Sequence, residues 1–386
     1  MKEPAIGEWI SPADAMRLAL QEGARGAGFV SPNPLVGCVI VDGDHRFLSS
    51  GYHKKVGFDH AEIDALKNLG DTAKVQGGHV YVTLEPCAHQ GRTGSCAKAL
   101  APLNPKSVTY AVEDPNPLVA GQGASILREA GVSCELLNSR HDVTEKDRLE
   151  LTAQAEELAE IFLHNFRTKE PFIAVKVASS LDGKMAFNSG ESKWITSEHS
   201  REHVQLLRAK YDAILIGKNT FVADNPSLNV RHPSYPGFVN KVVVLDPEGQ
   251  TLGAMAGSNL LAVRPPENVC VVVDAKLSVE NPSGVRVLKV PIYEDNVFMT
   301  DELFAALKGE GIHSVMVEGG AHAYGTFFSR GRVQRLHAFI APILMGGKHG
   351  LSWTSMFGGE SMKDRVVLKR VQRKNFGPDE YWTAQI

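Results

Sequence analysis

Three residues between positions 60 and 96 are of the types that bind zinc, and a carboxylate lies beside the first of them. His60 begins the sequence HAE, and Cys87 and Cys96 both lie in PCAHQGRTGSC. Catalytic zinc sites typically have three protein ligands and a fourth position for water, which becomes acidic enough to ionise near pH ~7. Glu62, which follows closely after the histidine, could then move protons without binding the metal.

The order of these residues follows a pattern of zinc chemistry on nucleobases. Deaminases of this kind carry H-x-E followed by P-C-x-x-C, whereas eight residues separate the two cysteines here. Cys87 follows the apolar run VYVTLEP and Cys96 opens the helix-like SCAKAL, so both could lie near helix N-termini, where the dipole favours thiolate. A structural zinc site would need a fourth protein ligand, and His89 could supply one. The sequence favours a catalytic zinc site and leaves a structural one as the alternative.

Composition and charge limit the class of protein. A chain of 386 residues suggests two or three domains at about 150 residues each, and 43% hydrophobic and 22% charged residues are ordinary for a globular protein. The formal net charge of −3 and the lack of a long Lys/Arg block argue against nucleic acid as the main partner. Five cysteines do not make a disulfide framework, so Cys38, Cys134 and Cys270 are expected to be reduced. Without an apolar leader or a run of ~18 apolar residues, we expect a cytoplasmic protein that does not enter a membrane.

The first part of the chain alternates between strand and helix patterns. Ser11 and Pro12 are typical of a helix start, and that helix is expected to run to about Arg25. Strands are expected over residues 36–44, 47–53, 80–86, 107–114 and 133–137, and further helices over 60–70, from 95 onward, and over 124–131. This alternation predicts a largely parallel sheet with helices on its faces.

Residues 138–170 are polar and favour helix, and a second α/β pattern follows them. We interpret this stretch as a linker helix that ends before Lys169-Glu170-Pro171. Strands are then expected over 171–183, 213–217, 241–246, 269–274, 313–320 and 335–344, with a helix over 197–211. No GxGxxG follows any of these strands, so a nucleotide in this half must be held in another way.

Four polar clusters in the second half lie at or just after predicted strand ends. They are residues 190–196, 217–220, 224–228 together with Arg231, and 318–320. Open α/β sheets bind ligands outside the carboxyl ends of their strands. A glycine pair before a helix, as at positions 319 and 320, lets backbone amides approach a phosphate closely. On these clusters alone the second half is an α/β domain whose ligand is unknown.

Taken together, HAE, PCAHQGRTGSC, DPNP, VKVASSLDGK, GESKWIT and DNPSL followed by Arg231 resemble the bifunctional deaminase–reductase family of riboflavin biosynthesis. The resemblance covers nearly the whole chain and involves both halves independently. It implies an α/β protein with a cytidine-deaminase-like α/β/α domain over residues 1–148, a linker helix over 149–170 and a dihydrofolate-reductase-like α/β domain over 171–386. The first domain would deaminate 2,5-diamino-6-(5-phosphoribosylamino)pyrimidin-4-one. The second would use NADPH to reduce the ribosyl group, which gives 5-amino-6-(5-phosphoribitylamino)uracil.

The resemblance also assigns roles to single residues. His60, Cys87 and Cys96 would bind Zn²⁺, and Glu62 would be the proton shuttle. Asn33 would contact the base, and His53, His89 and Arg92 would lie near the ribose phosphate. In the second half the substrate positions would be Ser192, Arg208, Leu228, Arg231 and Glu318, with the two arginines suited to the phosphate. The NADPH positions would be Ala178, Trp194, Thr220, Asp224, Pro247, Gly320, Ala321, His322, Ala323, Tyr324, Gly325 and Thr326. Lys176 and Asp224 would lie at the reducing centre as candidate proton donors.

Three positions depart from the family pattern, and two other functions stay open. Gly94-Ser95 stands where the family usually has Pro-Pro, Lys193 where Gln is common, and Pro247 where a small hydroxyl residue can occur. The alternatives are a nucleic-acid or nucleoside deaminase fused to an unrelated NADPH-binding domain, and a zinc-stabilised protein that senses a nicotinamide cofactor. Such two-domain enzymes are expected to be homo-oligomers, either dimers or tetramers. The sequence does not decide between NADPH and NADH.

Overall fold

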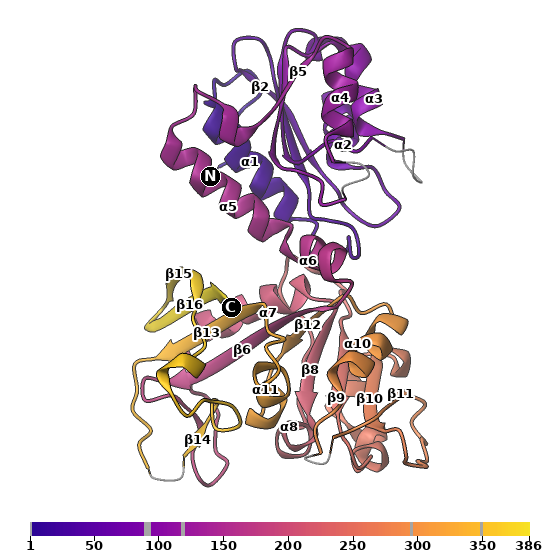
Figure 1. The fold of residues 1–386 in the computed structure, drawn as a ribbon, viewed down its shortest axis with the longest axis vertical. Coiled ribbons are helices and arrows are strands. Elements are labelled where there is room, and N and C mark those ends of the chain that lie inside the picture. Colours follow the sequence, from indigo (N-terminus) through magenta and orange to yellow (C-terminus); the bar gives the residue numbers. More distant parts are fainter. Residues whose placement is uncertain (1, 89–93, 117–119, 294–295, 348–349) are drawn as a thin grey trace. The chain divides into compact units, whose positions relative to one another are not determined.

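The chain forms two α/β units in a computed structural model that describes residues 2–88, 94–116, 120–293, 296–347 and 350–386. Unit 1 comprises Met1–Lys169 and unit 2 comprises Glu170–Ile386. Each unit contains a β-sheet with helices packed on its faces (Figure 1). The α/β fold expected from the sequence is confirmed.

Unit 1 contains a five-stranded sheet in the order β2-β1-β3-β4-β5. Its strands are β1 (Gly37–Val41), β2 (Phe47–Tyr52), β3 (His79–Leu84), β4 (Ser107–Val112) and β5 (Ser133–Leu136). Its helices are α1 (Pro12–Ala24), α2 (Ala61–Leu69), α3 (Cys96–Leu100), α4 (Gln122–Glu129), α5 (Glu145–Leu158) and α6 (Glu160–Thr168). The pairs β3–β4 and β4–β5 are parallel, but β1 is antiparallel to both β2 and β3. The expectation of a largely parallel sheet is therefore wrong for this half of the sheet, because the short turn between β1 and β2 makes them a hairpin.

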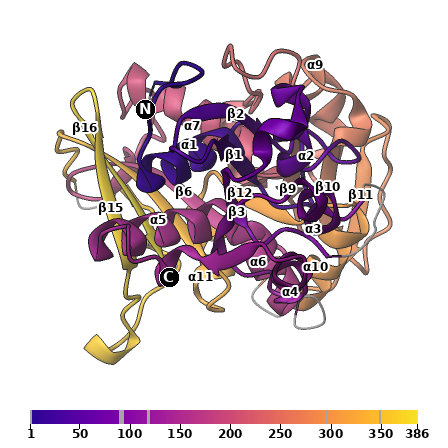
Figure 2. The same cartoon turned by 90° about the horizontal axis from the view of Figure 1, so that it is seen from above.

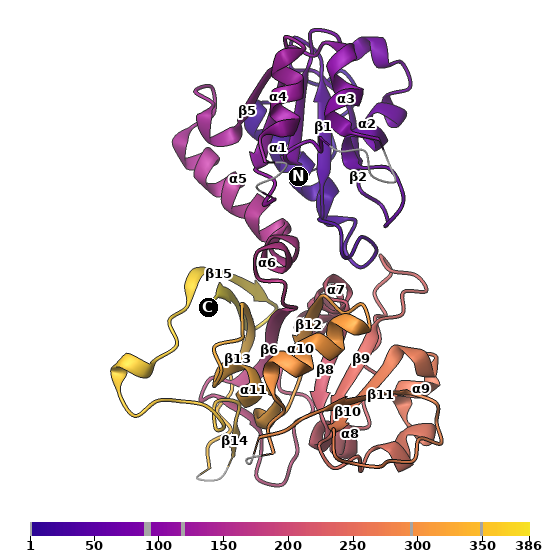
Figure 3. The ribbon, with the colours of Figure 1, turned by 45° about the vertical axis from the view of Figure 1, so that its right-hand side comes forward.

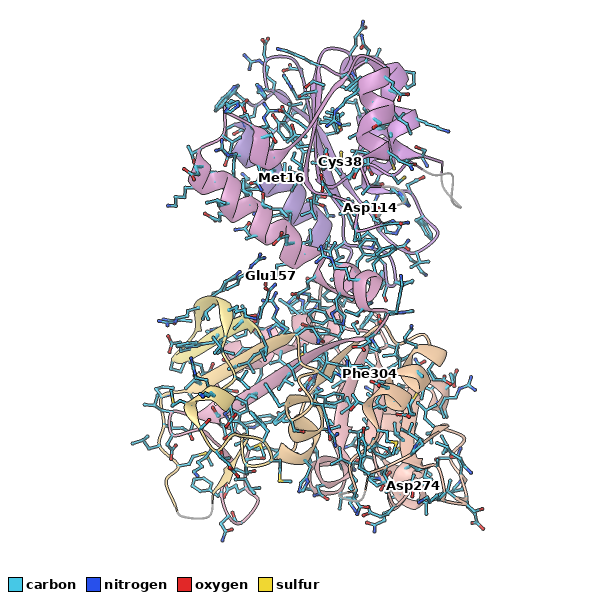
Figure 4. The ribbon with its side chains drawn as sticks, in the orientation of Figure 1. Met16, Cys38, Asp114, Glu157, Asp274 and Phe304 are labelled. Atoms are coloured by element: carbon cyan, nitrogen blue, oxygen red, sulfur yellow. The ribbon has the colours of Figure 1, made fainter. Side chains whose placement is uncertain are left out.

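Two hydrophobic cores lie on opposite faces of this sheet. On β1, Val39 and Val41 pack with α1 and α5, whereas Cys38 and Ile40 pack with α2, α3 and α4. This alternation follows from the two-residue period of a strand. Figure 4 labels Met16 of α1 and Cys38 of β1, which belong to the two different cores.

The stretch expected to be one linker helix forms two helices, both within unit 1, and the first of them packs in its core. Leu151 and Ala155 of α5 are spaced by one helical turn and are buried in the same core as α1. Such sparse apolar positions in a polar helix are enough to form a packing face.

With 14 residues α5 is the longest described helix. None of the described helices has the length and apolar character needed to cross a membrane.

Unit 2 contains a nine-stranded sheet in the order β11-β10-β9-β8-β12-β6-β13-β16-β15. The strands of this sheet are β6 (Phe172–Ser180), β8 (Ala213–Gly217), β9 (Lys241–Leu245), β10 (Val269–Asp274), β11 (Arg286–Val290), β12 (Ser314–Val317), β13 (Arg335–Ala341), β15 (Lys369–Phe376) and β16 (Asp379–Gln385). Two further strands, β7 (Lys184–Ala186) and β14 (Leu351–Ser352), pair with each other in a separate sheet. Its helices are α7 (Glu198–Lys210), α8 (Lys218–Asp224), α9 (Asn259–Ala262), α10 (Thr300–Gly309) and α11 (Ala321–Phe328). The seven strands from β11 to β13 are parallel, as the sequence pattern predicts.

Helices cover both faces of this sheet. α10 and α11 lie on one face (Figure 3), where Phe304 of α10, labelled in Figure 4, and Phe327 of α11 belong to one apolar core. α7 packs on the other face, where the His203 ring contacts Phe339 of β13 with ring centroids 6.1 Å apart.

The C-terminal hairpin of β15 and β16, which run side by side in Figures 1 and 2, was not expected from the sequence. The residues of β15 read KRVQRKNF and are mostly exposed, so they show no alternation of apolar and polar side chains. The hairpin nevertheless holds α7 in place. The buried carboxylate of Asp379 accepts hydrogen bonds from the Ser197 N–H (2.7 Å) and the Ser200 hydroxyl (2.5 Å) at the start of that helix.

Two histidine rings are stacked in unit 1. The rings of His45 and His79 stack with centroids 4.4 Å apart, and His79 Nδ1 lies 2.7 Å from the Ser107 hydroxyl. Burial, followed by the positive charges of His45 and Arg140, lowers the pKa of His79 to about 4. In the unfolded chain histidine titrates near pH ~6.5. As the pH falls below that value the unfolded state takes up the proton first, so unit 1 loses stability until the pH reaches the folded pKa.

We therefore expect the unfolding temperature of unit 1 to decrease as the pH is lowered from ~6.5 to ~4. The variant His79→Gln keeps a polar side chain but has no titrating ring, so its unfolding temperature should depend less steeply on pH. Scanning calorimetry of the full chain at a series of pH values measures both slopes. Equal slopes for the variant and the natural chain would show that His79 is not the titrating group.

Candidate active sites

The histidine and the acidic residue of the HAE sequence are placed by α2. His60 is the N-cap residue of this helix, and Glu62 lies in its first turn. The helix lies close against β2 because Gly51 has no side chain, since a Cβ atom there would come 2.2 Å from the Ala65 backbone nitrogen. A larger residue at this glycine would push away the helix that carries both functional groups.

The two cysteines lie where the chain leaves β3 and enters α3. Ser95, the N-cap residue of α3, accepts a hydrogen bond from the Lys98 N–H (3.3 Å) and donates one to the Cys87 carbonyl oxygen (2.8 Å). The Cys96 N–H donates to the Cys87 sulfur over 3.3 Å. Gly94-Ser95, a departure from the family pattern, thus supplies a cap that fixes the two cysteines relative to each other.

The side chains of His60, Cys87 and Cys96 converge on one point. Their ligand atoms lie within 4.8 Å of one another, and His60 Nδ1 is 3.5 Å from each sulfur. Hydrogen bonds with Cys96 and His60 lower the pKa of Cys87, which favours the thiolate form that binds metals. One imidazole and two cysteine sulfurs are a donor set that suits zinc and leaves a fourth position open. These residues therefore fit the metal that the sequence predicts.

Glu62 lies outside this group of ligand atoms but close to it. The residue is only 3% exposed, and burial together with the charge of Cys87 raises the pKa of its carboxyl to about 7. A carboxyl group with a pKa near neutrality both accepts and donates protons readily. The expected role of this carboxyl group as proton shuttle stays a prediction.

The side chains of Asn33 and His53 are hydrogen bonded to each other in unit 1. The His53 Nδ1 atom lies 2.9 Å from the carbonyl oxygen of Asp59, which can only accept, so this nitrogen carries the proton and Nε2 accepts from the Asn33 amide at 3.1 Å. Burial lowers the pKa of His53, which is 3% exposed. The described contacts of His53 hold the Asn33 amide, and its expected place near the ribose phosphate stays a prediction. His89 and Arg92, the other expected phosphate contacts, lie outside the described residues.

One further residue near the zinc ligands was missed by the sequence analysis. Glu85 is 4% exposed, and its carboxylate accepts hydrogen bonds from the N–H groups of Gly121 (3.0 Å) and Ala124 (3.3 Å). It thereby ties the end of β3, just before Cys87, to the start of α4. The signal in the sequence was an acidic residue at the end of an otherwise apolar strand.

Removing one cysteine ligand should remove the metal. We expect the natural chain to hold one zinc ion and Cys96→Ala to retain little after dialysis, because the remaining two ligands do not complete a zinc site. Cys134→Ala is the matched control, since Cys134 is also a buried cysteine of unit 1 but lies outside the cluster. Elemental analysis of both variants gives the zinc content per chain. Full zinc content in Cys96→Ala would mean that the metal is bound elsewhere.

In unit 2 the expected site residues gather at the carboxyl ends of neighbouring parallel strands. Glu318 directly follows β12, and the register that places Val317 opposite Val175 brings it beside Lys176 of β6. α8 and α11 begin at the same edge of the sheet, after β8 and β12. This is the edge at which open α/β sheets bind ligands.

A buried ion pair occupies the centre of this edge. Arg208 of α7 binds Glu318 with two hydrogen bonds, Nε to Oε1 at 2.7 Å and an Nη to Oε2 at 2.9 Å, and the two side chains are 13% and 6% exposed. Burial and the charge of Arg208 lower the pKa of Lys176, while Glu318 acts in the opposite direction. The guanidinium fork expected to bind phosphate is thus occupied by Glu318. The described contacts of Arg208 favour a role in fixing that carboxylate.

The segment after α8 carries two of the expected substrate residues. Leu228 is 6% exposed, whereas Arg231 is exposed and donates to the Asn229 side-chain oxygen over 3.0 Å. Asp224, the last residue of α8, lies 3.4 Å from the Lys193 ammonium group. Lys193, which departs from the family pattern, therefore links the 190–196 segment to Asp224.

Of the other expected positions, Trp194 is 71% exposed, and Ser192, Ala178, Thr220 and Pro247 are half-buried.

The glycine pair before α11 provides a surface for backbone contacts. Gly319 and Gly320 have φ values of +127° and +80°, and a Cβ atom on them would come 3.1 Å and 3.3 Å from the Thr220 hydroxyl. The first N–H groups of a helix lack partners within it and favour anions. Within α11 every residue except His322 is buried. The 320–326 run fits a dinucleotide phosphate, and the contacts would come mainly from backbone amides.

Two family models match the chain, one in each half. The model described as "Cytidine and deoxycytidylate deaminase zinc-binding region" matches residues 11–112, and the model described as "RibD C-terminal domain" matches residues 171–380. The first matched region contains the three zinc-ligand candidates, and the second contains the Arg208–Glu318 pair.

Relatives match the chain over nearly its full length. It is 38% identical to the riboflavin biosynthesis protein RibD of Bacillus amyloliquefaciens over 381 residues, which covers 96% of this chain and 95% of the relative. It is 35% identical to RibD of Escherichia coli strain K12, with 94% and 96% covered. Among solved structures, Acinetobacter baumannii RibD, form 1, has 34% sequence identity and a TM-score of 0.79, with 97% of this chain and 98% of that chain covered.

Proposed function

Because the chain belongs to the RibD family of bifunctional deaminase–reductases in riboflavin biosynthesis, we propose that it converts 2,5-diamino-6-(5-phosphoribosylamino)pyrimidin-4-one to 5-amino-6-(5-phosphoribitylamino)uracil in two steps. We assign deamination to residues 1–148, NADPH-dependent reduction to residues 171–386 and the connection to residues 149–170. The observation that carries this proposal is the convergence of one histidine and two cysteines beside a buried carboxylate, in a chain whose other half matches the reductase.

In the deamination step, we propose that His60, Cys87 and Cys96 hold zinc and that Glu62 moves the protons. Bound zinc supplies a water molecule acidic enough to lose a proton near neutral pH. The Glu62 carboxylate would take a proton from that water, which would then attack the ring carbon that bears the amine. The same carboxyl group then gives the proton to the departing nitrogen, which leaves as ammonia.

Substrate orientation in this step would depend on Asn33. Its amide is held by neutral His53, whose other ring nitrogen is fixed by a backbone carbonyl, so its direction is set before the base arrives. An amide fixed in this way can recognise the edge of a pyrimidine by its donor and acceptor pattern. His89 and Arg92 remain the proposed phosphate contacts.

In the reduction step, NADPH supplies the hydride and the protein positions the two reactants. We propose that the first-turn amides of α11, with Thr220, hold the cofactor phosphates, while Trp194 and Asp224 contact it from the facing segments. Glu318, fixed by Arg208, would hold the substrate, and Arg231 would meet its phosphate. Lys176 has a lowered pKa and lies beside Glu318, which suits it to deliver a proton as hydride arrives.

The substrate is then a small phosphorylated pyrimidine, and no nucleic acid takes part. The five cysteines, all described, form no disulfide. We propose a cytoplasmic location. A homo-oligomeric state, dimer or tetramer, stays a prediction.

The proposed function is tested by following ammonia and NADPH separately. Purified, zinc-loaded protein is given the diaminopyrimidine ribotide, first without and then with NADPH. We expect ammonia release in both cases and NADPH oxidation only after deamination. Ammonia without NADPH oxidation would contradict the assignment of residues 171–386, and no ammonia would contradict the substrate assignment.

A further inference from the structure

The segment from residue 225 to 231, here called the substrate loop, is held by side chains at three successive carbonyl oxygens. Ser227 O accepts a hydrogen bond from Arg264 (2.7 Å), Leu228 O from the Asn240 amide (2.9 Å), and Asn229 O from Arg208 (3.2 Å). Backbone carbonyls in an irregular loop otherwise depend on water for partners. The backbone of this loop is therefore fixed by distant parts of unit 2.

Two residues of the loop have an unusual backbone conformation. Asn225 and Leu228 have φ values of +38° and +49°, in the left-handed region that non-glycine residues seldom adopt. For a bulky residue such as leucine this conformation persists only where the surroundings enforce it, and such residues gather at ligand sites. The three hydrogen bonds to the carbonyl oxygens of residues 227–229 hold Leu228 in this conformation.

Asn240 and Arg264 together form the inner support of the loop. They are 2% and 4% exposed, and an Arg264 Nη also lies 3.4 Å from the Asn240 side-chain oxygen. The Asn240 amide thus accepts from Arg264 with its oxygen and donates to Leu228 O with its nitrogen. This arrangement leaves one orientation for the amide, because a flipped amide would lose both bonds.

Arg264 is buried without a counter-charge. Among the described residues no carboxylate acts on it as a counter-charge, and its Nε atom has no hydrogen-bond partner. Burial and the positive charge of Arg208 lower the pKa of Arg264 to about 10, so it is still charged at neutral pH. An unpaired buried charge is costly. Stability alone therefore does not account for this arginine, whereas a negatively charged ligand nearby would benefit from it.

We propose that Asn240 and Arg264 are positioning residues of the reductase, which hold the substrate loop in the conformation where Leu228 and Arg231 meet the phosphorylated substrate. This inference rests on the proposed reductase function of unit 2. It adds two residues that themselves need not touch the substrate.

The test compares variants of these residues with matched controls. Asn240→Asp is nearly isosteric but cannot donate to Leu228 O. Arg264→Met removes the charge and the hydrogen bonds to Ser227 O, Leu260 O and the Asn240 side-chain oxygen. In the controls, Asn281→Asp loses a similar amide bond, to Val285 O (2.7 Å), and Arg286→Met removes an exposed arginine, both near the β11 edge of the same unit. We expect the KM for 5-amino-6-(5-phosphoribosylamino)uracil to rise about tenfold in the first two variants, as for the loss of one buried hydrogen bond. The controls should keep the natural KM.

Two further readouts separate positioning from general damage to the fold. The KM for NADPH should stay unchanged in Asn240→Asp, because the proposed cofactor surface lies on α8 and α11. Arg264→Lys, which keeps the charge and can still reach Ser227 O, should have a substrate KM between those of the natural chain and Arg264→Met.

Each alternative result points to a different error. If Asn240→Asp and Arg264→Met have the natural substrate KM while the natural chain reduces the substrate, the positioning inference is wrong and the proposed function stands. If the KM values for NADPH and substrate rise together in Asn240→Asp, the two residues only support the fold. If the natural chain does not oxidise NADPH with this substrate, the proposed function and the inference fall together.

Discussion

Replacing Glu62 by alanine should abolish ammonia release while leaving zinc binding and NADPH-dependent reduction in place. A positioned acid–base group contributes about 10²–10⁴-fold to a rate, and Glu62 is proposed to serve in both proton transfers of the deamination. Its carboxylate lies outside the cluster of ligand atoms formed by His60, Cys87 and Cys96, so the metal should remain. Ammonia release, zinc content and reduction of pre-formed 5-amino-6-(5-phosphoribosylamino)uracil are measured on the same preparation.

Glu22→Ala is the matched control for Glu62→Ala. Glu22 is also a buried carboxylate of unit 1, at 6% exposure, but it lies on α1 and pairs with Arg25. This variant should keep ammonia release. Loss of zinc in Glu62→Ala, by contrast, would show that the carboxylate is a metal ligand and that the proposed proton shuttle is wrong.

Breaking the buried pair of Arg208 and Glu318 should have the largest effect in unit 2. Arg208→Met leaves the Glu318 carboxylate buried beside Lys176 without its two hydrogen bonds, and removing one partner of a buried pair costs about 3–5 kcal/mol. We expect unit 2 to be destabilised by that amount and reduction to be lost, while ammonia release continues in unit 1. Urea unfolding followed by tryptophan fluorescence reports mainly on unit 2, which contains Trp194, Trp353 and Trp382.

The double variant Arg208→Met/Glu318→Met separates stability from function. Replacing both partners of a buried pair by apolar residues is often neutral or stabilising, so much of the lost stability should return. Reduction should not return, because Glu318 is the proposed substrate contact. A double variant that reduces the substrate at the natural rate would show that the pair has a structural role only.

The fold class and the zinc cluster could be predicted from the sequence because both depend on local patterns. Alternation of strand and helix patterns indicated the two α/β halves, and ligand-type residues at the ends of predicted elements indicated the metal site. His60 occupies the N-cap position of α2, and Cys96 begins α3 as its sequence suggests. The family resemblance then gave the reaction, which the relatives support.

What the sequence did not predict depends on contacts between distant segments. Arg208 and Glu318 are 110 positions apart, and no local pattern indicates that they pair. Asn240 and Arg264 look like polar loop residues in the sequence, although both are buried. The antiparallel pairing of β1 with β3 and the β15–β16 hairpin likewise follow from pairing across the sheet, which strand patterns leave undetermined.

The central claim is that the chain carries two separate active sites which act in sequence, and mixing two variants tests it most directly. Glu62→Ala should lack deamination but keep reduction, and Arg208→Met/Glu318→Met should lack reduction but keep deamination. Each variant alone is given the diaminopyrimidine ribotide with NADPH, and then both are given it together. We predict that neither alone forms 5-amino-6-(5-phosphoribitylamino)uracil and that the mixture does, with one ammonia released for each NADPH oxidised. A mixture that forms no product, although each variant keeps its own half-reaction, would contradict the account.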